Sequence, residues 1–469
     1  MALLHHDARR TGLRARSLGE YAPRAARRRL HEDLIQAGIV TSVAVVIALY
    51  IADGGLSRIT GIGDAVGALG IAAGLVGTDL VLIMLLLAAR TPFVDRTIGH
   101  DRAMAIHGSL GKPAFLLIVA HVVLLLASYA MASGADLVTE AVAMWSLPDM
   151  PLAVLGFALM GVVVVTSLVA VRRRFRYEVW HLVHLSAYAA ALAALPHQFS
   201  LGGMFAEGTW QRWFWMAAIA AVLAALLVFR FAMPVVQTLR HRLEVIGIEP
   251  LADGVVSIVM TGRRLDALAA RGGQFFIWRF LAGGQWWQAH PYSLSEAPRP
   301  DRLRITVRAL GDGSASLARI RPGTRVAIEG PYGVFTDDAR TSERIAFIGA
   351  GIGVTPIRSM LEDARFRPGQ ATVVLRSPDD APPYLFDEIA GLCRAKGATC
   401  ITVPGPRGRS GWLTDAADAA GHSLVGFVPD ARDTDLYICG PRDWADHVVA
   451  DAAAAGVPEE RIHRERFDW

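Results

Sequence analysis

Four histidines lie within long apolar stretches, where an imidazole is costly to bury and usually faces other helices. His107 and His121 are 14 residues apart, which on one helix separates them by about 21 Å and keeps them nearly on one face. His184 and His197 occupy a second apolar stretch that runs in the same direction. Pairing His107 with His184 and His121 with His197 predicts two bis-imidazole haem sites at two depths, which would pass single electrons.

Two alternatives remain open for these histidines. The step from His184 to His197 turns about 140° away from a common face on an ideal helix, so we expect a distortion near Pro196 if both are ligands. His181 lies one turn before His184 and is the alternative ligand for the inner haem. Each histidine could also be a hydrogen-bonded residue of a helix bundle.

A second group of residues could bind a flavin. The sequence His290-Pro291-Tyr292-Ser293 precedes a turn that contains Gly313 and Ser314. A tyrosine and a hydroxyl at a strand end can stack on an isoalloxazine and donate to its N5 atom, and a Gly-Ser turn that opens a helix offers N–H groups to a pyrophosphate. An ordinary edge strand is the alternative interpretation of the first motif.

A third group could bind a nicotinamide nucleotide. The apolar segment 345–348 ends in a glycine-rich turn, residues 349–353, and a helix is expected to begin there. Glycines at the start of a helix permit close approach to a phosphate. A later apolar segment, 435–438, ends in Cys439-Gly440-Pro441, which could place a thiol beside the nicotinamide. A buried structural cysteine is the alternative.

The elements that carry these residues follow from the hydrophobic pattern. Six apolar runs are long enough to cross a hydrocarbon core of about 30 Å, at 34–52, 65–89, 104–131, 151–171, 177–196 and 213–236. Short alternating runs such as 303–309 and 325–329 predict an antiparallel β-barrel. From about residue 344, strands and helices alternate, which predicts a Rossmann-like α/β domain with a parallel sheet. We therefore expect a multidomain membrane protein with a basic tail (1–33), a six-helix haem-binding transmembrane bundle (34–237), an FAD-binding barrel (238–338) and an NAD(P)H-binding domain (339–469).

The charges predict the topology and the partners. Arginines are concentrated in the N-terminal tail and in segments 90–112 and 172–176, whereas segment 132–150 has neither arginine nor lysine. By the positive-inside rule, both termini are cytoplasmic in a multi-pass protein of the cell membrane. Because the arginines flank apolar runs, the lipid bilayer is the expected partner and nucleic acid is not. Lys112 and Lys396 are the only lysines, a bias typical of a GC-rich bacterial genome.

Residues 90–469 resemble the ferric reductase and NADPH oxidase family, which fuses a membrane cytochrome to a ferredoxin-reductase-like tail. The resemblance rests on Gly99-His100-Asp101-Arg102, on Tyr177-Glu178-x-Trp180-His181-x-x-His184, and on the order of the nucleotide motifs. It implies haem ligation by His107, His121, His184 and His197, FAD contacts by His290, Tyr292, Ser293, Gly313 and Ser314, and nicotinamide contacts by Gly349, Gly351, Gly353, Thr355, Pro356, Cys439, Gly440 and Pro441.

The end of the chain also resembles this family. In the motif matched by Glu465-Arg466-Phe467, an aromatic ring covers the isoalloxazine until the nicotinamide displaces it, but this chain continues to Trp469, so either ring could do so. Ser293, Cys439 and Phe467 are thus the predicted catalytic residues. Arg376 and Arg409 lie where family members often contact the 2′-phosphate of NADPH. These two arginines favour NADPH over NADH.

The predicted function is electron transfer across the membrane. A hydride from NAD(P)H would reduce FAD, and single electrons would pass through the two haems to an acceptor outside the cell. Cys393, Cys400 and Cys439 lack C-x-x-C spacing, so an iron–sulfur cluster is not expected. The short outer loops favour a small acceptor, either oxygen, giving superoxide, or a ferric chelate. The alternatives are an electron-transfer subunit that donates to an extracytoplasmic protein, and a membrane-anchored flavin reductase without haem.

Overall fold

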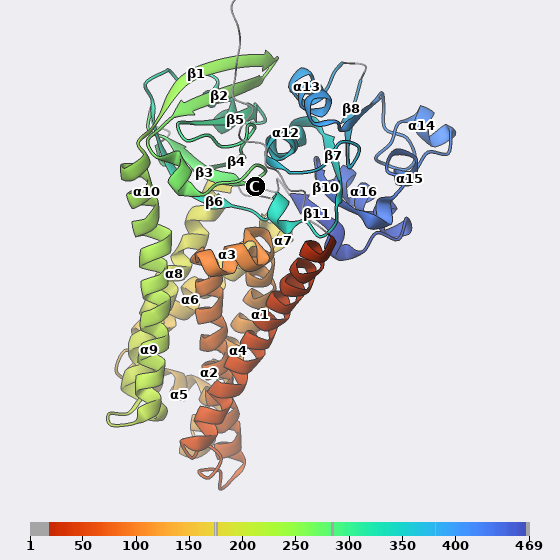
Figure 1. The fold of residues 1–469 in the computed structure, drawn as a ribbon. Helices are drawn as coiled ribbons and strands as arrows, with labels where there is room; N and C mark the ends of the chain where they lie inside the picture. Colours follow the sequence, from red (N-terminus) through yellow and green to blue (C-terminus); the bar gives the residue numbers. More distant parts are fainter. Residues whose placement is uncertain (1–17, 173, 175–176, 283–285, 380, 466–469) are drawn as a thin grey trace, which may run out of the picture. The chain divides into compact units, whose positions relative to one another are not determined.

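The computed structural model describes residues 18–172, 174, 177–282, 286–379 and 381–465, which fall into two compact units (Figure 1). The helical unit comprises Glu32–Val94 and Arg102–Phe231. The reductase unit contains the chain from Ala232 onward together with the short segment Asp95–Asp101. This segment comprises the end of the short helix α3 (Pro92–Ile98), Gly99 and the first two residues of the third long helix, so the reductase unit is not continuous in sequence.

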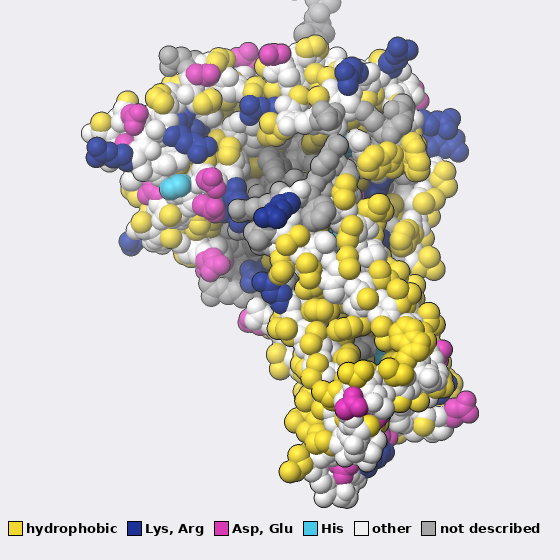
Figure 2. Space-filling model, turned by 180° about the vertical axis from the view of Figure 1, so that it is seen from behind, with side chains coloured by type: hydrophobic (Ala, Val, Ile, Leu, Met, Phe, Trp, Pro, Cys, Tyr) yellow, Lys and Arg dark blue, Asp and Glu magenta, His cyan; other side chains and the backbone are white. Residues whose placement is uncertain are grey.

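The helical unit confirms the predicted transmembrane bundle. Six helices are long and apolar enough to cross a membrane, and hydrophobic side chains cover most of the visible surface of this unit (Figure 2). The spans are Asp33–Ala52, Ile62–Ala88, His100–Ser133, Met150–Ser167, Val179–Leu201 and Trp210–His241. They belong to α1 (Leu18–Ala52), α2 (Ile62–Ala88), α4 (His100–Ser133), α6 (Met150–Ser167), α8 (Tyr177–Leu201), and α9 (Trp210–Ala225) with the π-helix η2 (Leu226–Ala232) and α10 (Met233–His241). The shorter helices are α3 (Pro92–Ile98), α5 (Leu137–Trp145), α7 (Val169–Arg172) and η1 (Gly203–Phe205).

Glycines on α2 bring this helix close to α4. A Cβ atom on Gly70 would lie 3.1 Å from the Leu124 side chain, and one on Gly77 would lie 3.0 Å from Ile118. The Ser128 hydroxyl donates to the carbonyl oxygen of Gly63 at 2.9 Å. Small residues permit such close packing of membrane helices, because lipid provides no hydrophobic drive for their association.

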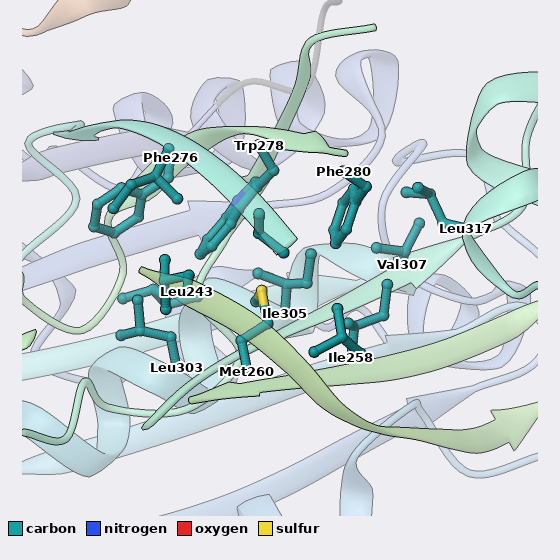
Figure 3. Close-up of a cluster of buried hydrophobic side chains, with 14 of the residues drawn as sticks. Leu243, Ile258, Met260, Phe276, Trp278, Phe280, Leu303, Ile305, Val307 and Leu317 are labelled. Carbon is teal, nitrogen blue, oxygen red and sulfur yellow. The ribbon is translucent and has the colours of Figure 1, made fainter. Parts of the chain in front are cut away.

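The first half of the reductase unit is an antiparallel barrel. Its six strands are β1 (Leu243–Ala252), β2 (Val255–Thr261), β3 (Phe275–Phe280), β4 (His290–Ser293), β5 (Arg302–Arg308) and β6 (Arg325–Tyr332), in the order β4-β3-β6-β1-β2-β5. A bridge between Leu294 and Ile305 joins the two edges and closes the barrel. Alternate residues of each strand point inward and fill the core, where Trp278, Phe276 and Phe280 are the largest side chains (Figure 3).

The second half is a parallel α/β domain. Its sheet has the order β11-β10-β7-β8-β9, built from β7 (Arg344–Ala350), β8 (Ala371–Ser377), β9 (Thr399–Pro404), β10 (Thr434–Cys439) and β11 (Ile462–Glu465). The chain moves outward from β7 to β9 and then returns to the other side of β7 with β10. The C-terminal ends of β7 and β10 therefore form the switch point at which such sheets bind nucleotides. The helices are α12 (Val354–Asp363), α13 (Phe386–Lys396), α14 (Asp415–Ala419), α15 (Leu424–Phe427) and α16 (Arg442–Ala454), and the barrel carries α11 (Asp312–Leu317).

Ion pairs join the barrel to the α/β domain. Glu388 of α13 accepts hydrogen bonds from Arg304 of β5 at 2.7 and 3.1 Å, and it pairs with Arg358 of α12 at 2.8 Å. The pKa of Glu388 is lowered: burial raises it, but the hydrogen bond and charge of Arg304 and the charge of Arg358 outweigh this effect. Because Arg304 is buried, the Glu388 carboxylate compensates a guanidinium charge that would otherwise be costly to bury between the barrel and the α/β domain.

Candidate redox sites

The two histidines of α4 make the same hydrogen bond at two levels of the bundle. Nδ1 of His107 donates to the Met84 carbonyl oxygen at 3.0 Å, and Nδ1 of His121 donates to the Gly70 carbonyl oxygen at 2.8 Å. Both acceptors lie on α2, and they are 14 residues apart, as are the two histidines. In each ring the donor is occupied, so the lone pair is left on Nε2, the arrangement typical of metal-ligating histidines.

The α8 histidines lie near these two rings. The ring centres of His107 and His184 are 6.1 Å apart. The Ser167 hydroxyl donates to the Val163 carbonyl oxygen, and Nδ1 of His184 lies 3.2 Å from the Ser167 oxygen, which can accept its proton. Nε2 of His184 is thereby also left as the free nitrogen.

The outer pair is less fully supported by hydrogen bonds. His197 lies close enough to His121 for the rings to interact electrostatically, and α8 runs as one helix through Pro196. Among the described residues, no side chain bonds to the buried Nδ1 of His197, and the ring interacts with the Ala194 backbone one turn earlier. His181, the alternative inner ligand, contacts Trp180 with ring centres 6.4 Å apart.

The inner pair has dimensions suited to a shared metal ion. A coordination bond of about 2 Å from each imidazole places two ring centres roughly 6 Å apart, close to the 6.1 Å between His107 and His184. Because both helices are tied by hydrogen bonds to their neighbours, the two rings are held in place without a ligand. These residues therefore fit a bis-histidine haem.

In the barrel, the predicted flavin residues lie together around β4. The rings of His290 and Tyr292 stack with centres 5.8 Å apart and planes 7° from parallel. Burial raises the pKa of the Tyr292 hydroxyl well above its usual range, so it stays protonated. A Cβ atom on Gly313 would lie 3.2 Å from the His290 ring, which places the start of α11 against the same surface.

The Ser293 hydroxyl is suited to contact a bound flavin. Its side chain is 3% exposed, and its hydroxyl has no hydrogen-bond partner within the described ranges. A buried hydroxyl without a partner is costly and usually marks a position that a ligand or water completes. The location at the end of β4, beside the stacked rings, fits FAD.

The two nicotinamide motifs meet at the switch point of the parallel sheet. Cys439 of β10 pairs in register with Gly349 of β7 on one side and with Glu465 of β11 on the other. A Cβ atom on Gly353 would lie 2.3 Å from the Cys439 carbonyl oxygen, so only glycine permits the turn to pack here. Thr355 and Pro356 follow in the first turn of α12.

Two acidic residues of the motifs quoted above, Glu465 and Asp101, lie near this thiol, although neither was assigned a role from the sequence. Burial raises the pKa of Glu465 well above its usual range, and the nearby charge of Asp101 raises it further. The pKa of Cys439 is also raised, first by burial and then by the charge of Glu465. Burial thus favours the neutral form of both the Cys439 thiol and the Glu465 carboxyl. Only the alignment of β10 with β11 could have revealed this pair, and local sequence patterns do not give strand register.

Asp101 belongs to the segment Asp95–Asp101, which packs on the barrel. The His100 ring stacks on Tyr332 with centres 5.6 Å apart, and it lies 3.5 Å from the Asp95 carboxylate. Its side chain is 2% exposed. A motif that the sequence assigns to a loop of the membrane domain thus forms part of the reductase unit.

The remaining predicted residues lie further out or outside the described ranges. Arg376 of β8 is buried, and it donates to the carbonyl oxygens of Trp412 and Val403, both at 3.2 Å. Its pKa is lowered by burial and by the neighbouring charge of Arg407. Arg409 is exposed. Phe467 and Trp469 lie outside the described residues, so it stays a prediction that one of them covers the flavin.

The fold and these sites define a membrane protein that carries a nucleotide-dependent flavin module, and comparisons with known proteins agree. Residues 73–195 match the ferric reductase like transmembrane component, and residues 242–336 match an FAD-binding domain. The chain therefore carries a ferric reductase-like transmembrane domain fused to a ferredoxin-reductase-type FAD module.

Relatives of the C-terminal half are flavoproteins. A flavohemoprotein of Deinococcus radiodurans is 27% identical over 47% of this chain and 54% of its own length. Ferredoxin--NADP reductase B of Sorangium cellulosum is 31% identical over 40% of this chain and 81% of its own length. The FAD/NAD-binding domain of nitric oxide dioxygenase from Vibrio cholerae is 21% identical, with a TM-score of 0.39 over 48% of this chain and 98% of that domain. The chain thus spans about half of the flavohemoprotein that it matches.

Proposed function

We propose that this protein is an NAD(P)H-dependent oxidoreductase of the cell membrane that carries electrons from a cytoplasmic nucleotide to an acceptor outside. The two matched hydrogen bonds from α4 to α2 carry the proposal, because they present two imidazole nitrogens at two levels of one bundle. When bound, FAD would accept two electrons as a hydride and release them one at a time, and two b-type haems would relay them. His107 with His184, and His121 with His197, would hold the two irons.

At the donor end, the residues of the chain bind and orient the nucleotide. Gly351 and Gly353 allow the pyrophosphate to approach the first turn of α12, whose N–H groups point outward. Cys439, at the end of β10, would limit the position of the nicotinamide ring. The Ser293 hydroxyl would donate a hydrogen bond to N5 of the flavin. Glu465, whose pKa is raised by burial, would hold a proton next to this site more readily than an exposed carboxyl.

We infer a preference for NADPH. Arg376, Arg407 and Arg409 follow or end the strands β8 and β9, where the 2′-phosphate would lie. Among the described residues, Nη2 of Arg376 is buried without a partner, and Arg407 is exposed nearby. Steady-state oxidation of the two nucleotides tests this inference. A kcat/KM for NADH that greatly exceeds the value for NADPH would contradict it.

The haem assignment is tested by histidine variants of the full-length protein. We expect His121→Ala and His107→Ala each to bind one haem per chain in place of two, with loss of the corresponding low-spin absorption. His181→Ala is the matched control, because His181 lies on α8 one turn before His184. This variant should keep both haems. An unchanged spectrum in His121→Ala would reject the ligand assignment and favour a membrane-anchored flavin reductase.

A small electron acceptor is favoured, because the described segments at the far ends of the helices, 53–61, 134–149 and 202–209, are short. Superoxide production and ferric-chelate reduction should be measured in sealed vesicles with NADPH on the cytoplasmic side. Activity with either acceptor supports the proposal. Rapid haem reduction with no activity towards either would favour a subunit that donates to an extracytoplasmic protein.

A further inference from the structure

Two cysteines of the α/β domain lie next to each other on the side of the sheet covered by α12 and α13. Cys393 is in the last turn of α13 and is 1% exposed, whereas Cys400 is the second residue of β9 and is partly exposed. Gly397 ends α13 with a φ of 69°, and the Ala398 N–H donates to the Cys393 carbonyl oxygen at 2.9 Å. The chain therefore reverses sharply and brings the two residues together.

Strand register places both side chains on one face. Cys400 pairs directly with Val373 of β8, and residues paired in this way point to the same side of a sheet. Val373 and Cys393 belong to one core cluster, and Cys400 packs against that cluster. Ile401, the next residue, packs against the cluster on the opposite face. The two thiols are within hydrogen-bonding reach of each other.

The two thiols differ in acidity and access. The hydrogen bond from Cys393 lowers the pKa of Cys400 to about 7, burial opposes this effect, and the charge of Arg394 adds to it. The same interaction raises the pKa of Cys393, together with burial. Near neutral pH a large share of the partly exposed Cys400 is thus ionised to the nucleophilic thiolate, and the buried Cys393 keeps its proton.

We propose that Cys393 and Cys400 form a peroxide-sensitive dithiol that closes reversibly to an intramolecular disulfide. The Cys400 thiolate sulfur attacks an oxygen of hydrogen peroxide, the O–O bond breaks, and a sulfenic acid and a hydroxide ion form. The hydroxide takes from solvent the proton that Cys400 released on ionising, which gives the first water. The Cys393 sulfur then attacks the Cys400 sulfur, the S–O bond breaks, and the released hydroxide takes the Cys393 proton as a second water. Two thiols are oxidised by two electrons in total, and one peroxide is reduced to two waters. This site does not depend on the proposed route of the electrons.

The test uses the reduced, FAD-loaded full-length protein with one to five equivalents of hydrogen peroxide, followed by alkylation in denaturant and peptide mass spectrometry. We expect Cys393 and Cys400 to lose alkylation together and to yield one linked species about 2 Da lighter than the two thiols, restored by a dithiol reductant. Cys439, which is fully buried, is the internal control and should remain alkylated.

Two variants assign the roles. Cys393→Ser should leave Cys400 as a sulfenic acid that dimedone traps, and Cys400→Ser should leave Cys393 reduced at the same dose. Retained FAD absorption shows that each variant is folded. The proposal is rejected if Cys393 and Cys400 are no more reactive than Cys439, or if dimedone traps Cys400 in the wild-type protein without any linked species.

Discussion

At the scale of single residues, a glycine leaves the space that one histidine of the proposed electron path occupies. Gly74 of α2 faces the His121 ring, and a Cβ atom at this position would lie 2.4 Å from Nδ1 of the imidazole. The same ring donates to the Gly70 carbonyl oxygen one turn earlier. Gly74 therefore positions the outer ligand by leaving room for it.

We predict that Gly74→Ala displaces His121 and removes the outer haem. Overpacking a tight contact costs about 1–3 kcal/mol, and a rotated ring would lose its hydrogen bond as well. Haem content should fall from two towards one per chain in the pyridine haemochrome assay. Gly63→Ala is the control, since its Cβ would lie 3.6 Å from the Met131 side chain, an ordinary contact. Two haems per chain in Gly74→Ala would contradict the positioning role.

Glu465 gives a prediction about pH. Its folded pKa is raised above the usual 4.5, so the folded state binds more protons than the unfolded state between these values. The free energy of unfolding should therefore fall as pH rises from about 4.5 towards the raised pKa, with a limiting slope of about 1.4 kcal/mol per pH unit. Glu465→Gln removes this titration, so its stability advantage over the wild type should grow with pH. Thermal release of FAD across a pH series measures this difference.

The exposed neighbour Glu459, in the turn that precedes β11, provides the matched control. Glu459→Gln should follow the wild-type pH dependence. If Glu465→Gln gave the same curve as the wild type, Glu465 would be ionised in the folded protein.

At the scale of elements, α12 is held at both ends. Its first turn follows the glycine-rich turn of the nucleotide site, and its last carbonyl groups are capped by one of the two lysines in the chain. Nζ of Lys396 donates to the carbonyl oxygens of Leu361, Glu362 and Ala364 at 2.7, 2.9 and 2.7 Å. A cation at a helix C-terminus also interacts favourably with the helix dipole.

We expect Lys396→Met to destabilise the reductase unit by about 3 kcal/mol, because hydrogen bonds from a charged donor contribute roughly 1.5–3 kcal/mol and three carbonyls would lose their partner. The midpoint of thermal FAD release should shift downward. The other lysine supplies the control, as Lys112 is exposed on α4 and Lys112→Met should leave the midpoint unchanged. Equal midpoints for both variants would show that the cap has little effect.

The sequence predicted the elements far better than the contacts between them. The six spans, the barrel strands and the glycine-rich turn after β7 follow from local periodicity, so they were recoverable. The approach of His107 to His184 was predictable in outline because helical spacing limits which faces can meet. Glu465 and the thiol pair were not recoverable, since their environments are set by strand register and by packing between distant segments.

At the scale of the whole molecule, the division into parts differs from a simple linear reading of the chain. The sequence places the boundary between the membrane and reductase parts at residues 237–238, and within the described residues Asp95–Asp101 also belongs to the reductase unit. His100 is buried there against Tyr332, and Asp101 lies close enough to affect Glu465. The local sequence around Asp95–Asp101 does not indicate that this segment packs against a domain that begins more than a hundred residues later.

The equal hydrogen bonds of His107 and His121 have a consequence for redox potentials. If these residues ligate iron as proposed, the α4 side gives both metals imidazoles of similar basicity, and it cannot by itself make one easier to reduce. The α8 side differs, because His184 contacts the Ser167 hydroxyl, whereas His197 interacts with the Ala194 backbone. Any difference between the reduction potentials of the two irons would therefore arise from the α8 ligands, and the Ser167 hydroxyl would contribute to it.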